Sequence, residues 1–159
     1  MKAIMACDAN FGIGKDGSLP WPRNTDDLRE FRDLTTNHIV IMGSKTWEDP
    51  VFPKPLPNRK CYIITRNPEY ADSRGFIINK NLEKTIRTLK IEAFQENKDI
   101  WVIGGAEILE LLYPYIEEFH LTVFHENYDC DKFIKNPLET FKVESSEERE
   151  DCVKYILKR

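Results

Sequence analysis

The chain has 159 residues, of which 41% are hydrophobic and 31% charged, and it carries a formal net charge of −4. This length is sufficient to bury a substantial core, and we expect a single domain over residues 1–159. The acidic balance excludes the basic field typical of proteins that bind nucleic acid or anionic lipid, and no apolar run approaches the roughly 18 residues of a membrane span.

Cysteine and histidine usage bears on compartment and metal content. Cys7, Cys61, Cys130 and Cys152 are widely spaced and form no C-x-x-C pair. They are therefore interpreted as reduced thiols of a cytoplasmic protein. The three histidines do not combine with cysteines or carboxylates at a zinc-ligand spacing, so no metal is expected.

Five short apolar runs begin the series of predicted elements, at 3–7, 38–42, 61–65, 76–78 and 100–103. Most are continuously apolar, which is typical of strands that are covered on both faces. Helix-like segments occur at 25–36, 44–49, 81–96 and 106–112. This alternation of strands and helices predicts a parallel α/β sheet.

The C-terminal third has a different pattern. Strands are predicted at 118–124, 140–145 and 152–158 without helices between them, and the last two form a candidate antiparallel hairpin through SEERED, 146–151. The predicted fold class is therefore α/β, with a central, mostly parallel sheet of roughly eight strands, about four flanking helices and an antiparallel C-terminal strand.

Two segments match nucleotide-binding motifs only superficially. GIGKDG (12–17) has the spacing G-x-G-x-x-G, but Pro20 and Pro22 follow almost at once and prevent a helix from opening there, so we expect a mobile loop instead. GSKT (43–46) resembles the end of a P-loop but lacks its upstream glycine and its Gly-Lys pair.

The segment IWVIGGAEILELL (100–112) is more informative, because a buried strand ends in two glycines and continues into an amphipathic helix. One interpretation is a tight turn of small residues. The other is a helix start whose backbone N–H groups meet an anionic ligand at the carboxyl edge of the sheet. MGSKTW (42–47) repeats the arrangement with Lys45 at a helix start, and two such starts suit the two ends of a dinucleotide.

The predicted helix that follows SLPWPRN contains two adjacent aspartates. Asn24 and Thr25 are both good N-caps. From there, Asp26 shares its face with other charged residues, namely Arg29, Glu30 and Asp33, so this face is predicted to point to solvent.

Asp27, in contrast, shares its face with Phe31 and Leu34 and adjoins Leu28. It can serve simply as an acid in the first turn of the helix, or close a capping box with Asn24. A carboxylate on an apolar stripe is costly unless it is bonded to a partner, and this makes Asp27 a candidate site residue.

Six segments of the chain occur in a characteristic order and spacing: GIGKDGSLPW, DDLREF, IVIMGSKTWE, PLPNRKCYIITR, WVIGGAEI and FHLTVF. Through these segments the chain resembles dihydrofolate reductase over nearly its whole length. The resemblance implies reduction of 7,8-dihydrofolate to tetrahydrofolate with NADPH, in support of one-carbon and thymidylate metabolism. It also implies a cytoplasmic enzyme, expected to be a monomer, whose partners are dihydrofolate and antifolate inhibitors, not nucleic acid or membrane. The peptide bond between Gly104 and Gly105 is cis in the family.

In the resemblance, Asp27 is the acid that binds N3 and the 2-amino group of the pterin and promotes protonation of N5, through a water held near Trp21. A protonated imine accepts hydride far more readily. Thr122 corresponds to the threonine that bonds to this carboxylate, although it can also be an ordinary strand residue. Trp21 can equally be a packing aromatic.

The remaining site residues also follow from the resemblance. Arg59 corresponds to the arginine that binds the glutamate α-carboxylate of the substrate. Ile4 and Ile103, at strand ends, are predicted to bind the pterin through their backbone carbonyls. Leu28, Phe31 and Leu56 are predicted to line an apolar pocket for the p-aminobenzoyl group, and Ala6 is also a predicted substrate residue. The predicted cofactor residues are Ala6, Ile13, Gly14, Ser18, Leu19, Gly43, Ser44, Lys45, Thr46, Ile64, Thr65, Arg66, Gly104, Gly105, Ala106, Glu107, Ile108 and Leu109. Lys45 and Arg66 lie near the 2′-phosphate in this assignment.

Three features depart from the family pattern. Leu109 replaces a tyrosine that many members carry near the nicotinamide. Glu107 lies where some members have an arginine, so the preference for NADPH depends on Lys45 and Arg66. The segment EDPVFPKPLP (48–57) is longer than in compact bacterial members, and no substrate-rim residue is assigned within 49–55.

Two rival functions are kept for comparison. The first is a reductase of the same fold that acts on another pterin or on a riboflavin-pathway pyrimidine; Arg59 argues against it, because those substrates lack a glutamate tail. The second is a non-catalytic nucleotide-binding or assembly protein, and the presence of both Asp27 and the Gly-Gly turn argues against that.

Overall fold

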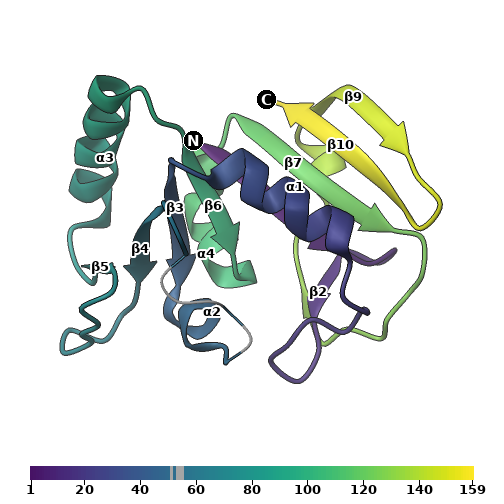
Figure 1. Cartoon of the computed structure of the whole chain (residues 1–159), viewed down its shortest axis with the longest axis horizontal. Coiled ribbons are helices and arrows are strands. Elements are labelled where there is room, and N and C mark those ends of the chain that lie inside the picture. The colour runs from purple at the N-terminus through teal and green to yellow at the C-terminus, as the bar shows by residue number, and fades with distance from the viewer. Residues whose placement is uncertain (51, 53–55) are drawn as a thin grey trace.

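An eight-stranded sheet forms the centre of the protein (Figure 1). The structure is a computed structural model that describes residues 1–50, 52 and 56–159. The strand order is β5-β4-β3-β6-β1-β7-β10-β9; neighbours from β5 to β7 are parallel, and β10 is antiparallel to both β7 and β9. The strands are β1 (Lys2–Cys7), β3 (Ile39–Gly43), β4 (Lys60–Ile64), β5 (Phe76–Ile78), β6 (Ile100–Gly104), β7 (Glu118–Phe124), β9 (Lys142–Glu148) and β10 (Cys152–Lys158).

Helices connect the parallel strands, as the alternating pattern predicted. They are α1 (Thr25–Thr35), α2 (Ser44–Glu48), α3 (Leu82–Glu96) and α4 (Ala106–Leu112), with the short 3-10 helices η1 (Tyr113–Tyr115) and η2 (Pro137–Glu139). Figure 1 shows α1 running across one face of the sheet, near β7. Within the described residues, no helix is long and apolar enough to cross a membrane.

The core lies on both faces of the sheet, because the central strands are apolar at successive positions. All five residues of β3 are buried, and so are four of the five in β6. One core cluster contains Ile41, Val102 and Phe119, and a second contains Val40, Trp47 and Trp101. The continuously apolar runs therefore belong to strands covered on both sides, as predicted.

Two predictions about local structure were wrong. Residues 12–14 are not a loop but a short strand, β2 (Gly12–Gly14), paired with β8 (Lys132–Phe133). The side chain of Asp8 stabilises this segment by accepting a hydrogen bond from the backbone N–H of Gly12. Position 12 has no room for a side chain, because a Cβ there would lie only 2.3 Å from Cβ of Cys130. The turn between β9 and β10 is also shorter than predicted, since β9 extends to Glu148.

Candidate active site

The sheet divides between two of its parallel strands. β1 pairs with β6 only at Lys2 and Ala3, whereas on its other edge β1 stays paired with β7 as far as Cys7. Ile4 and Ile103 are the next residues on the two separating strands. Ile4 therefore lies in the middle of β1, not at a strand end as predicted, and it borders an opening in the sheet because its strand pairs on one side only. Such an opening at the carboxyl edge of parallel strands is where open α/β sheets bind ligands.

Helix α1 brings Asp27 to this part of the sheet. Asn24 is the N-cap, and its side chain accepts the backbone N–H of Asp27 at 2.9 Å. The side chain of Asp27 is 25% exposed, whereas that of Asp26 is 75% exposed. The orientation of the two aspartates is therefore as predicted from the helical face.

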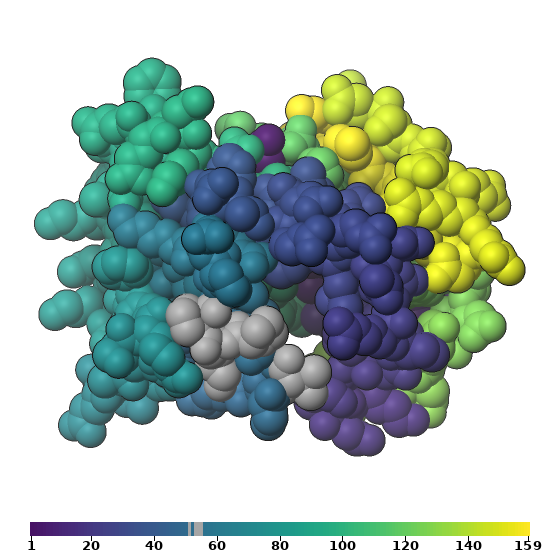
Figure 2. Space-filling view, in the orientation of Figure 1, coloured from purple at the N-terminus to yellow at the C-terminus, as the bar shows by residue number. Residues whose placement is uncertain are grey.

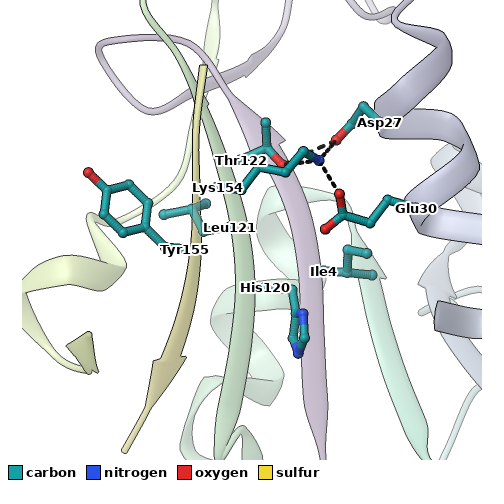
Figure 3. Close-up of a pocket in the computed structure, with 8 residues that line it drawn as sticks. All are labelled: Ile4, Asp27, Glu30, His120, Leu121, Thr122, Lys154 and Tyr155. Atoms are coloured by element: carbon teal, nitrogen blue, oxygen red, sulfur yellow. Dashed lines mark hydrogen bonds and ion pairs between the residues drawn. The ribbon is translucent and has the colours of Figure 1, made fainter. Parts of the chain in front are cut away.

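Asp27 contacts the sheet through the threonine that the resemblance implied. The hydroxyl group of Thr122, on β7, donates a hydrogen bond of 3.1 Å to Oδ1 of Asp27. Thr122 is 6% exposed and pairs with Ala6 across the two parallel strands. A small hollow opens beside this contact (Figure 3), and it is lined by Ile4, Asp27, Glu30, His120, Leu121, Thr122, Lys154 and Tyr155.

Two residues of this hollow, Lys154 and Glu30, were missed by the sequence analysis. Lys154 Nζ lies 3.0 Å from Oδ1 of Asp27 and 2.8 Å from Oε2 of Glu30. Glu30 had been grouped with Asp26 on the solvent face. The alternation of β10 did contain a signal, because Lys154 occupies the same buried face as Cys152. A charged residue at such a position requires a partner.

The environment of Lys154 favours its charged form. Burial acts to lower the pKa of Lys154, but the hydrogen bonds that Lys154 donates to Glu30 and Asp27, together with the negative charges of these two acids, outweigh it and raise the pKa above its usual value. The ammonium group is therefore a permanent positive charge next to Asp27 at physiological pH.

Several of the other predicted substrate residues lie on α1 or next to it. Phe31 packs against the core cluster that contains Leu56, which is 3% exposed, whereas Leu28 is 43% exposed on the same helix. Arg59 lies 5.8 Å from the ring centroid of Phe31 and donates to the hydroxyl group of Thr35 at 3.1 Å. A groove beside it is lined by Arg32, Asp33, Thr36, Asn37, Pro57, Asn58 and Arg59. Residues 51 and 53–55 of the unassigned rim lie outside the described residues.

Trp21 is placed as a packing residue. Its ring lies 5.0 Å from that of Phe124 and 6.0 Å from that of Tyr128, and only 9% of the residue is exposed. The same small cluster contains Cys130 and Cys152 and contacts Ala6. The proposed role of Trp21 in holding a water stays a prediction.

The predicted cofactor residues come together at the carboxyl ends of three neighbouring strands, β4, β3 and β6. Ile64, Gly43 and Gly104 end these strands, and the residues that follow them begin the adjoining turns and helices. Gly104–Gly105 is a cis peptide bond, as the resemblance implied. On the remaining segment, Ile13 and Gly14 belong to β2, and Ser18 and Leu19 are exposed just beyond it.

The charged residues at this edge are positive in the segments that follow β3 and β4 and negative in the helix that follows β6. Lys45 and Arg66 are exposed, and within the described part of the chain neither forms an ion pair. Glu107 is exposed on α4. Leu109, in contrast, is only 2% exposed and packs in the apolar core, and its predicted contact with the cofactor stays a prediction.

Small residues leave space for a ligand at the end of β6. A Cβ on Gly105 would have Thr46 Oγ1, at 3.8 Å, as its nearest neighbour, which leaves this side of the turn open. An extended phosphate-bearing ligand fits here, because backbone can approach it closely where no side chain intervenes. Among the described residues, no group of three histidine, cysteine or acidic side chains could hold a metal ion.

Fold and site together define an α/β enzyme in which a partly buried carboxylate and a glycine-rich nucleotide edge flank an opening in a parallel sheet. The chain belongs to the dihydrofolate reductase family, since the family's sequence model, described as dihydrofolate reductase, matches residues 1–157.

Individual relatives agree with this assignment. Dihydrofolate reductase type 8 of Escherichia coli is 37% identical over 138 residues, which cover 84% of this chain and 79% of the relative. Dihydrofolate reductase of Bacillus subtilis (strain 168) is 34% identical over 146 residues, which cover 91% and 82%. Dihydrofolate reductase from Enterococcus faecalis, solved with NADP(H) and RAB-propyl, matches with a TM-score of 0.77 and 26% identity over 98% of this chain and 93% of that one.

Proposed function

We infer that the chain, as a member of this family, reduces 7,8-dihydrofolate to tetrahydrofolate with NADPH as its cofactor. We propose that Asp27 binds the pterin and promotes protonation of its N5 atom. The observation that carries this proposal is the placement of one half-buried carboxylate, bonded to Thr122, beside the opening between β1 and β6. Burying a carboxylate is costly unless it has partners, and a partly buried acid with one oxygen left unbonded is a candidate for binding a ligand.

The hydrogen bonds of Asp27 leave one oxygen for the substrate. Thr122 and Lys154 both donate to Oδ1. Among the described residues, none donates to Oδ2 from its side chain. Oδ2 is therefore available to accept hydrogen bonds from the pterin ring, whose N3 and 2-amino group are donors. A negative carboxylate that is hydrogen-bonded to the bound ring favours a positive charge on that ring, and so favours protonation at N5.

The remaining roles are assigned to groups around this carboxylate. Leu28, Phe31 and Leu56 line the p-aminobenzoyl pocket, Arg59 binds the α-carboxylate of the glutamate tail, and the carbonyls of Ile4 and Ile103 bind the pterin edge. The turns after β3, β4 and β6 hold NADPH, which supplies the hydride when bound, and Lys45 and Arg66 contact its 2′-phosphate. The planar guanidinium of Arg59 is suited to two parallel hydrogen bonds with a carboxylate.

We also propose a domain organisation, an oligomeric state and a cellular compartment for the protein. It is a single domain over residues 1–159 and a monomeric enzyme of the cytoplasm, with small molecules as its ligands. The compartment is proposed from the cysteines, all four of which are buried and free, because free thiols persist in a reducing environment.

The test compares the two adjacent aspartates. In Asp27→Asn, oxidation of NADPH in the presence of dihydrofolate should fall by at least about a hundredfold at neutral pH and recover in part at low pH, as solvent protonates the substrate. NADPH binding and the thermal midpoint should stay close to wild type. Asp26→Asn is the matched control and should remain fully active. If Asp26→Asn were inactive and Asp27→Asn active, the proposal would be wrong.

A further inference from the structure

The ammonium group of Lys154 has a complete set of partners in a nearly buried position. The residue is 9% exposed, and an ammonium group has three N–H donors. Its three acceptors are Asp27 Oδ1 at 3.0 Å, Glu30 Oε2 at 2.8 Å and Thr122 Oγ1 at 3.1 Å. Figure 3 shows the lysine extending from β10 toward the two acids of α1. This arrangement fixes the ammonium group in one place.

The same contacts also fix the carboxylate of Asp27. The hydroxyl group of Thr122 accepts from Lys154 and donates to Oδ1 of Asp27, so the lysine, the threonine and the aspartate form a closed ring of hydrogen bonds. Both hydrogen bonds to Asp27 are accepted by Oδ1. They hold the carboxyl group through one oxygen and leave Oδ2 available to a ligand.

The charges of this cluster cancel only in part. Asp27 and Glu30 are both negative and Lys154 is positive, so the three side chains together retain one negative charge. Without Glu30, the lysine would neutralise Asp27 and remove the field that favours a protonated pterin. Without Lys154, two carboxylates would face each other across one turn of α1 and would disfavour each other's ionised form. The triad therefore keeps the charge of a single carboxylate at the opening.

Other charged groups near Lys154 are balanced by partners of their own. Glu147, its register neighbour on β9, pairs with Arg149 at 3.1 Å, and the same arginine lies 3.7 Å from Glu30. His120, which also lines the hollow, lies 3.0 Å from Glu118. No charged residue of β1 faces this point in the hollow. The two acids of α1 are thus the partners that determine the effect of the lysine.

We propose that Lys154 is a positioning residue of the reductase, which fixes the carboxylate of Asp27 for the pterin, and that Glu30 is its counter-charge. This inference rests on the proposed role of Asp27. It assigns to β10 a part in setting the pH range over which hydride transfer proceeds.

The test follows the rate of hydride transfer in single turnovers of NADPH oxidation as a function of pH. Lys154→Met leaves an extra negative charge near the pterin, so the midpoint of the profile should move to higher pH by about one unit. Glu30→Gln removes a negative charge, so its midpoint should move to lower pH by a similar amount. Lys154→Arg retains the cation and should restore a midpoint close to wild type. These signs hold whether the proton that is followed lies on the carboxyl group or on the pterin.

Lys158→Met is the matched control, because Lys158 lies on the same strand but pairs with Glu118 instead of Asp27. Its midpoint should not move. A folded Lys154→Met variant with lower stability and an unchanged midpoint would show that the lysine only anchors α1 to β10, and would overturn the proposal. If Lys154→Met does not fold, the pH profile of Glu30→Gln tests the inference instead. A midpoint for Glu30→Gln that is equal to or higher than that of the wild type would contradict it. Full activity in Asp27→Asn would instead refute the proposed role of Asp27.

Discussion

Ile108 occupies the space that a side chain on Gly43 would need. A Cβ at position 43 would lie 2.8 Å from Cγ1 of Ile108, so the end of β3 and the first turn of α4 pack directly against each other. Gly105, at the start of the same helix, has room for a side chain, because the nearest atom to a Cβ there would be Oγ1 of Thr46 at 3.8 Å. The two glycines therefore have different functions, one in packing and one in leaving room for the cofactor.

We predict that Gly43→Ala lowers the free energy of unfolding. The backbone at Gly43 has φ −80° and ψ 160°, which alanine can adopt, so the cost comes from the contact with Ile108. Overpacking of this kind costs about 1–3 kcal/mol. Urea denaturation measures the change. Ile108→Ala removes Cγ1, so in that background the loss caused by Gly43→Ala should be smaller than in the wild type. An absence of any loss in Gly43→Ala would refute the packing explanation.

Gly105→Ala should have the opposite result, with nearly normal stability but weaker cofactor binding. The backbone of Gly105, at φ −79°, accepts alanine, and its Cβ would make only an ordinary contact with Thr46. The stability should therefore stay within about 1 kcal/mol of wild type. The added methyl group enters the space assigned to NADPH, so the dissociation constant of NADPH should rise by about tenfold. Unchanged NADPH affinity in the folded variant would exclude this assignment.

The preference for NADPH over NADH should depend on Lys45 and Arg66. Hydrogen bonds to a charged group contribute about 1.5–3 kcal/mol, so each replacement by methionine should reduce the ratio of kcat/KM for the two cofactors by at least about tenfold. Glu107→Gln should increase the ratio, because it removes a negative charge from the same edge. Lys142→Met, on the exposed strand β9 at the other end of the sheet order, is the control and should leave the ratio unchanged. A wild-type ratio near one would refute the role of both cations.

Patterns within one element allowed most of the fold and the central acid to be predicted. Continuous apolar runs indicated the parallel strands, and the helical face of α1 distinguished Asp27 from Asp26. What local patterns could not show was contact between distant segments. Lys154 and Asp27 are 127 positions apart, and Glu30 was misplaced because its own helix gave no sign of the partner on β10. The short strand β2 was missed for the same reason, since it exists only through its pairing with β8.

The opening between β1 and β6 could not be predicted from sequence either. Ile4 and Ala3 are both apolar and both belong to β1, yet only Ala3 pairs with β6. The separation depends on how the two strands diverge in space, which hydrophobic periodicity does not encode. The role of Ile4 in binding substrate stays a prediction from the resemblance, whereas its predicted position at a strand end was wrong.

Glu118, at the start of β7, links stability to acid pH. Its side chain is 13% exposed and pairs with Lys158, with His120 at 3.0 Å and with Lys2 at 3.2 Å. Burial acts to raise the pKa of Glu118, but the hydrogen bonds from Lys158, His120 and Lys2 outweigh it and lower the pKa to about 2. An acid whose pKa is lower in the folded state stabilises the protein above its unfolded pKa, and this contribution is lost as the pH falls toward the folded value.

We therefore predict that Glu118→Gln lowers the free energy of unfolding by about 1–2 kcal/mol at neutral pH, with the difference from wild type disappearing between about pH 4.5 and pH 2. Below that range wild-type Glu118 is itself protonated, so the two proteins should become equally stable with respect to this group. Glu144→Gln is the control, because Glu144 is exposed and its oxygen lies 3.8 Å from Lys158. That variant should follow the wild-type curve throughout. A difference between Glu118→Gln and wild type that stayed constant down to pH 2 would show that the loss comes from packing and not from the ionised carboxylate.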